Sequence, residues 1–219
     1  MQRHEELVKT DFDFGWKNWK YVPEIARLML DRQKGDNLDV GCATCQLCSF
    51  LRDNGWKGKY VGMDVIKHEG FEYPEDVDLL IGDAVKMDFP AIDTVVMYDL
   101  LEHVDDPVSL LSKAFKAARH NVLVSVPLRN EEMWKHGVVE PHQIDRTHKH
   151  SGFSKEEFLR IVELSGRKVK DCLEMGKADA TIGVNLWESR LAKKLTYLMK
   201  KLFRSKEFYC GMWCELVKA

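Results

Sequence analysis

The sequence predicts an α/β fold in which a doubly wound, mostly parallel sheet is covered by helices on both faces. Short apolar runs alternate with helix-length segments along the 219 residues, which is typical of a helix-covered parallel sheet. In the first half of the chain, acidic residues close these apolar runs. With 45% hydrophobic and 31% charged residues, the composition excludes a disordered chain and a membrane-spanning bundle. We therefore expect a single domain over residues 1–219.

The apolar runs predict seven strands, separated by five helices. The expected strands are Asn37–Gly41, Tyr60–Asp64, Asp78–Ile81, Thr94–Tyr98, Asn121–Val126, Arg167–Glu174 and Phe208–Val217. The expected helices are Pro23–Gln33, Cys45–Asn54, Pro107–Ala118, Lys155–Leu164 and Leu186–Phe203. The fourth helix has the clearest boundaries, because Ser154 and Glu157 form a capping-box pattern and Gly166 follows its end.

Two terminal segments have a composition of their own. Residues 1–22 hold five aromatic side chains, too many for a disordered tail, and are expected to form a lid over the sheet or its ligand. Residues 186–206 predict an amphipathic helix with leucines on one side and lysines on the other. This helix either packs on the sheet with a solvated basic face or makes peripheral contact with an anionic membrane. No signal-peptide core begins the sequence, so a cytoplasmic location is expected.

The six cysteines are expected to be reduced thiols, as in most cytoplasmic proteins. Cys42, Cys45 and Cys48 have a spacing that invites a metal-site interpretation. However, Cys45 and Cys48 fall one turn apart on an expected sheet-packed helix, and the next cysteine is Cys172. Buried thiols are the expected outcome.

Acidic residues at the ends of four strands indicate a ligand site. These are Asp39, Asp64, Asp83 and Asp99. In open parallel sheets, ligands bind beyond the carboxyl ends of the strands, where these side chains would gather. A carboxylate after the second strand can accept both hydroxyls of a ribose, and one after the third can accept from an exocyclic amine. The set therefore suits an adenosine-bearing ligand.

The turn after the first strand reads Asp39-Val40-Gly41-Cys42-Ala43-Thr44-Cys45, and Leu101-Glu102-His103-Val104 follows the fourth strand. With the later segment Val122–Pro127, these residues resemble class I S-adenosylmethionine-dependent methyltransferases, nearest to small-molecule and quinone O-methyltransferases. The resemblance covers about residues 36–175 and implies a Rossmann-like, seven-stranded sheet whose last strand is antiparallel.

The resemblance also implies a cofactor, S-adenosylmethionine, and its binding residues. Asp64 would meet the ribose, and Asp83 with Ala84 the adenine. The full set implied by the resemblance is Asp39, Gly41, Cys42, Ala43, Asp64, Val65, Asp83, Ala84, Tyr98, Asp99 and Leu100. Of these, the stretch from Gly41 to Ala43 would line the methionine portion, and Tyr98 to Leu100 would flank the sulfonium.

The first turn departs from the family pattern of three alternating glycines. Ala43 and Cys45 stand where the second and third glycines are expected. An alanine fits close to a cofactor when its φ is negative, so we expect negative φ at Ala43, and we expect Cys45 to open the following helix. The absence of a G-x-G-x-x-G match argues against a nicotinamide dehydrogenase.

The expected function is methyl transfer to a small-molecule or lipid-like acceptor, with His103 or His142 as the base where the acceptor must lose a proton. Residues 129–153 follow the fifth strand and, with the N-terminal lid, are expected to roof the acceptor pocket. No resident metal is expected. The alternative is a divalent ion held by Asp99, Glu102, His103 and the histidines of that loop, which are His136, His142, His148 and His150.

Two other functions remain open on the sequence alone. A metal-assisted 2′-O-methyltransferase acting on RNA ends is one, because the Glu102-His103 segment partly matches that branch, and nucleic acid would then be the partner. A degenerate methyltransferase fold serving as a binding or scaffold module is the other.

Overall fold

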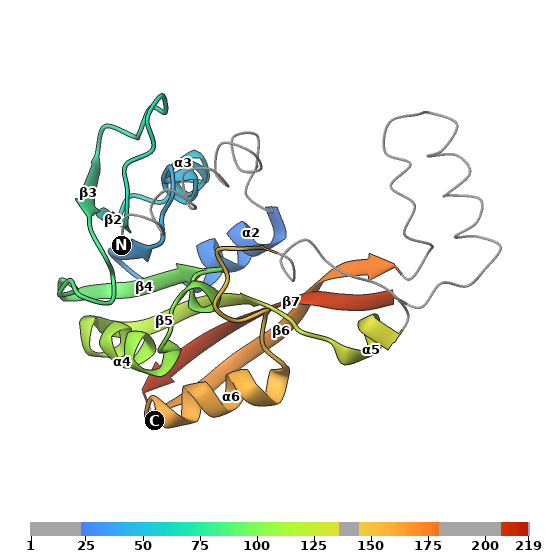
Figure 1. Ribbon diagram of the computed structural model, residues 1–219. Coiled ribbons are helices and arrows are strands. Elements are labelled where there is room, and N and C mark those ends of the chain that lie inside the picture. Colours follow the sequence, from blue (N-terminus) through green and yellow to red (C-terminus); the bar gives the residue numbers. More distant parts are fainter. Residues whose placement is uncertain (1–22, 136–144, 180–206, 219) are drawn as a thin grey trace, which may run out of the picture.

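One mixed sheet of seven strands organises the part of the chain that the computed structural model describes, residues 23–135, 145–179 and 207–218 (Figure 1). The strands are β1 (Asn37–Val40), β2 (Tyr60–Asp64), β3 (Val77–Ile81), β4 (Ile92–Tyr98), β5 (Ala118–Pro127), β6 (Arg167–Asp179) and β7 (Glu207–Lys218). Their order is β3-β2-β1-β4-β5-β7-β6, and β7 runs antiparallel to both of its neighbours. The expected α/β fold with an antiparallel last strand is confirmed.

Helices cover both faces of this sheet, as Figure 1 shows. The helices are α2 (Pro23–Arg32), α3 (Gln46–Asp53), α4 (Pro107–Ala117), α5 (Glu131–Lys135) and α6 (Lys155–Leu164), with a 3-10 turn, η2 (Leu101–His103), after β4. α2 and α3 lie on one face, and α4 and α6 on the other. The short α5 lies after β5, where the sequence predicts no helix.

Alternating side chains of the central strands divide the core into two layers. On β4, Val95 and Met97 pack with α4 and α6, whereas Val96 packs with α2 and α3. On β7, Trp213 is fully buried in the layer of the core that packs with α2 and α3, which we call the second layer. Because successive residues of a strand point to opposite faces, strands buried on both sides read as continuous apolar runs. This explains why the runs are visible in the sequence.

Side-chain caps set the starts of α4 and α6. Asp106 accepts from the Ser109 amide at 3.0 Å, and Pro107 occupies the first turn of α4. In α6, Ser154 and Glu157 form the reciprocal capping box that the sequence predicts, and Gly166 follows the helix with φ 78°. These polar pairs satisfy amide groups that no helical carbonyl can reach.

The cysteines differ from expectation at one pair. Cys172 and Cys214 face each other across β6 and β7 and are joined in a disulfide, so the prediction of six reduced thiols is wrong here. The strand register brings them together, and no sequence spacing indicates it. Cys42, Cys45 and Cys48 are buried thiols, as expected.

Several predicted segments lie outside the described residues. They are the aromatic lid 1–22, the basic helix 186–206 and the loop positions His136 and His142. Among the described helices, none is both long enough and apolar enough to cross a membrane.

The capping box generates a stability prediction. Ser154→Ala removes the acceptor for the Glu157 amide and should lower the free energy of unfolding by about 1 kcal/mol. Glu156→Ala, at an exposed position in the same helical turn, should change it by less than about 0.5 kcal/mol. Urea denaturation of both variants measures the difference, and equal losses would contradict a specific role for the cap.

Candidate active site

A cavity of about 460 Å³ opens at the carboxyl ends of β1, β2 and β4. All eleven residues that the resemblance implied as cofactor-binding line it, and so does His103. Asp39, Asp64, Asp83 and Asp99 each contribute to its wall. The strand order reverses between β1 and β4, which is where open α/β sheets form their ligand crevice.

The turn after β1 adopts the conformation of a glycine-rich turn without the later glycines. Ala43 has φ 46° and Cys45 has φ 58°, so the expected negative φ at Ala43 is wrong. Cys45 is the residue before α3 and not its first residue, because its left-handed backbone lies outside the helix. A left-handed conformation costs a non-glycine residue roughly 1–2 kcal/mol.

Hydrogen bonds from two neighbouring residues hold this strained turn. Asp64 Oδ2 at the end of β2 accepts from the Ala43 amide at 2.7 Å. Tyr73 donates its hydroxyl to the Ala43 carbonyl at 3.2 Å and accepts from the His68 amide at 3.0 Å. Both backbone groups of Ala43 are therefore bonded, which maintains the turn against its intrinsic preference. Tyr73 and His68 were missed by the sequence interpretation.

Burial changes the ionisation of the acidic groups around the cavity. Burial raises the pKa of Asp39 to about 7, although the Tyr60 hydroxyl donates to its carboxylate. Burial also raises the pKa of Asp64, opposed by the amide of Ala43. At Asp99, burial raises the pKa to about 6, while Ser125 donates to its carboxylate at 2.9 Å. A cationic ligand would favour the ionised form of these groups.

A lysine holds the loop that the resemblance places at the adenine. Lys113 on α4 donates from Nζ to the carbonyls of Ala84, Val85 and Met87 at 2.9, 2.7 and 2.8 Å. Three carbonyls converging on one ammonium fix the backbone of this loop. Lys113 lies 29 residues from Ala84 in the sequence. No local sequence pattern therefore indicates that it holds this loop.

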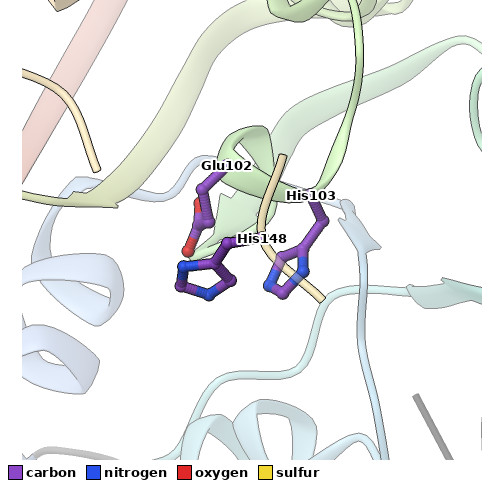
Figure 2. Close-up of side chains that lie close together, drawn as sticks. All are labelled: Glu102, His103 and His148. Atoms are coloured by element: carbon purple, nitrogen blue, oxygen red, sulfur yellow. The ribbon is translucent and has the colours of Figure 1, made fainter. Parts of the chain in front are cut away.

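Where His103 lines the cavity, its side chain forms a cluster with Glu102 and His148. One potential ligand atom from each lies within 4.8 Å of the others, and the rings of His103 and His148 are 4.5 Å apart, edge to face. Figure 2 shows the carboxylate of Glu102 directed toward the ring of His148, with His103 beside it. Glu102 is fully buried, and burial together with the charge of Asp99 raises its pKa well above the ordinary value.

Backbone hydrogen bonds bring His148 to this cluster. The Glu102 carbonyl accepts from the amides of Lys149 and His150, at 2.7 and 3.0 Å. His150 Nε2 also lies 3.0 Å from the Val104 carbonyl. Residues 149 and 150 are therefore held against η2, and His148 with them. Of the loop histidines, the structure brings His148 to the site, whereas the predicted base His142 lies outside the described residues.

The sheet order and the cavity define a Rossmann-like methyltransferase fold. A family model described as "Methyltransferase domain" matches residues 17–171. The chain belongs to this methyltransferase family, and the expected enzyme class, an S-adenosylmethionine-dependent methyltransferase, is confirmed.

Solved structures with the same fold have diverged far in sequence. Magnesium protoporphyrin IX methyltransferase from Synechocystis, with SAH bound, is 14% identical over 98% of this chain and 100% of that chain, with a TM-score of 0.60. An O-methyltransferase family 2 protein from Planctomyces limnophilus, in complex with apigenin, is 14% identical over 100% of this chain and 62% of that one, with a TM-score of 0.60. A cyclopropane synthase from Mycobacterium tuberculosis is 16% identical over 90% of this chain and 84% of that one, with a TM-score of 0.56.

At these identities the similarity is one of fold. No protein with a curated description matches the sequence significantly.

The strained turn generates the second prediction. Ala43→Gly removes a methyl from a residue with positive φ and should raise the free energy of unfolding by about 0.5–1 kcal/mol, or leave it unchanged. Ala117→Gly, in the last turn of α4, should instead lower it by about 1 kcal/mol. Thermal and urea unfolding compare the two, and a loss of stability in Ala43→Gly would contradict the strained conformation.

Proposed function

We propose that this protein transfers the methyl group of S-adenosylmethionine to a small-molecule acceptor. The observation that carries the proposal is the cavity itself, whose wall gathers the eleven implied cofactor residues from four separate strand ends. The magnesium protoporphyrin IX methyltransferase and the apigenin complex, both of the same fold, support an acceptor of this class.

The residues present suit this cofactor. S-Adenosylmethionine supplies a methyl group on a sulfonium and also carries an ammonium group. Asp39 and Asp99 provide carboxylates in the wall, and Gly41, which has φ 79° and no side chain, lines the same cavity. A ligand portion can therefore approach the backbone of the turn closely, as the methionine portion would require.

Catalysis by this chain would rest on positioning. The acceptor's electron pair would form the new bond to the methyl carbon while the sulfur keeps the electrons of the S–CH3 bond and departs as a neutral thioether. Holding the acceptor oxygen, nitrogen or carbon in line therefore supplies most of the rate enhancement. Tyr98 ends β4, Asp99 and Leu100 follow it, and His103 comes next on η2. With the sulfonium at Tyr98 to Leu100, His103 would stand at the acceptor end of the cavity.

Cofactor titration tests the proposal directly. Asp64→Ala should weaken S-adenosylmethionine binding by about tenfold to a hundredfold, because the ribose loses a charged acceptor and the Ala43 amide loses its partner. Asp78→Ala is the control, since Asp78 is exposed on β3 and pairs with Lys59. Isothermal titration calorimetry measures both.

Two results would contradict parts of this function. Equal affinity of wild type and a folded Asp64→Ala variant would contradict the ribose placement. No binding by wild type at sub-millimolar cofactor would favour a binding or scaffold module.

The raised carboxyl pKa values predict a pH dependence of cofactor binding. Below about pH 7 the wild-type carboxyl of Asp39 is protonated, so a cationic ligand must first displace its proton. Affinity should therefore rise with pH up to about 7, by at most about tenfold per pH unit for each proton released.

Asp39→Asn should weaken binding at neutral pH and remove the step near pH 7, so that the affinity falls only at lower pH, where Asp99 titrates at about 6. Calorimetry between about pH 5.5 and about pH 7.5 follows the profile, with Asp78→Asn as the control. A variant that keeps the wild-type profile would show that Asp39 does not face the ligand's charge.

A further inference from the structure

We propose that Glu102, His103 and His148 form a binding site for one first-row divalent cation beside the cavity, at the point where His103 lines it. Two imidazoles and one carboxylate form a ligand set suited to Zn²⁺, Mn²⁺ or Fe²⁺, and three protein ligands leave positions open for a substrate. The proposal that the ion binds here does not depend on the proposed function, whereas a role of the ion in methyl transfer rests on it.

The buried carboxylate is the main observation. Glu102 is 0% exposed, and neither of its oxygens has a hydrogen-bond partner among the described residues. An ionisable group buried in this way is costly unless a cation or a donor meets it. Figure 2 shows this carboxylate aimed into the space that it shares with the two histidine rings. A cation in that space would satisfy it.

The geometry brings the three side chains close enough for one ion. Their candidate ligand atoms lie within 4.8 Å of one another. Tetrahedral zinc with bonds of about 2.0–2.1 Å needs ligand atoms about 3.4 Å apart, so small side-chain rotations would close the site. Glu102 and His103 are adjacent on η2, and the two amides that bond the Glu102 carbonyl hold His148 beside them.

A neighbouring carboxylate, that of Asp145, supports His148 in the proposed site. Asp145 Oδ2 lies 3.6 Å from His148 Nε2, and Asp145 Oδ1 accepts from the amide and hydroxyl of Thr147 at 2.7 and 2.6 Å. A carboxylate held in this way can orient a metal-binding histidine. Of the three ligands His103 lines the cavity, as do the nearby Asp145, Thr147 and Lys149, so the ion would lie at the wall that the acceptor meets. There it would polarise an acceptor hydroxyl and ease the loss of its proton.

Metal titration of the full chain tests this inference. After removal of metals with a chelator, wild type should bind one Zn²⁺ per chain in calorimetry, with the stoichiometry checked by elemental analysis. Glu102→Gln, His103→Ala and His148→Ala should each weaken binding at least about tenfold. His120→Ala, which removes an exposed histidine at the start of β5, should bind as wild type does. Mg²⁺ should bind far more weakly, because histidines suit it poorly.

Two further measurements distinguish this site from a thiolate metal site and from a carboxylate that binds no ion. Co²⁺ in place of Zn²⁺ should give a spectrum without thiolate bands, which excludes Cys42, Cys45 and Cys48 as the ligands. Zn²⁺ should raise the melting temperature of wild type and not of Glu102→Gln. Without metal, Glu102→Gln should melt at or above the wild-type temperature, because the buried carboxylate is gone.

Two results would overturn the proposed metal site. Undetectable Zn²⁺ binding by wild type at sub-millimolar concentration, or unchanged binding in the folded His103→Ala/His148→Ala variant, would overturn the site. S-Adenosylmethionine titrated in the presence of chelator should bind wild type and Glu102→Gln equally. Loss of cofactor binding by wild type would count against the proposed function alone and leave the metal result standing.

Discussion

The central strand β1 imposes the constraint on which the rest of the site depends. It is paired in parallel on both sides, with β2 and β4, and all four of its residues are buried. The chain can leave it only by a tight turn over the carboxyl edge of the sheet. The hydrogen bond from the Ala43 amide to Asp64 closes this turn against the end of β2. The cavity wall, the start of α3 and the approach of a ligand to the backbone all follow from that closure.

The turn shows how a protein can hold a backbone conformation without the residues that favour it. Glycine adopts left-handed backbone freely, whereas Ala43 and Cys45 must be held there. Asp64 and Tyr73 supply hydrogen bonds to Ala43, and Cys45 is fully buried against the second core layer. Packing and polar contacts from β2 and its following loop therefore compensate for an unfavourable local choice, which is the usual condition for strain at functional sites.

The charges of the site fall into two groups with different surroundings. Asp39 is buried and Asp99 is half-buried, but they accept hydrogen bonds from Tyr60 and Ser125, so they can ionise when a cation arrives. Glu102 is buried without any such donor in the described part of the chain, and it faces two imidazoles. One part of the cavity thus suits an organic cation, and the adjoining part suits a metal ion. If both proposals hold, the two sites would adjoin where β4 passes into η2, and an acceptor would lie between them.

The sequence by itself determined the sheet, the helices α2, α3, α4 and α6, and the acidic residues at the strand ends. Continuous apolar runs mark strands buried on both faces, and strand ends are local positions, so Asp39, Asp64, Asp83 and Asp99 could be found without coordinates. Only the tertiary structure decided the backbone angle of Ala43, the pairing of Cys172 with Cys214, the reach of Lys113 and the selection of His148 from the loop histidines. Each of these depends on contacts between residues distant in the chain, whose register and direction no local pattern encodes.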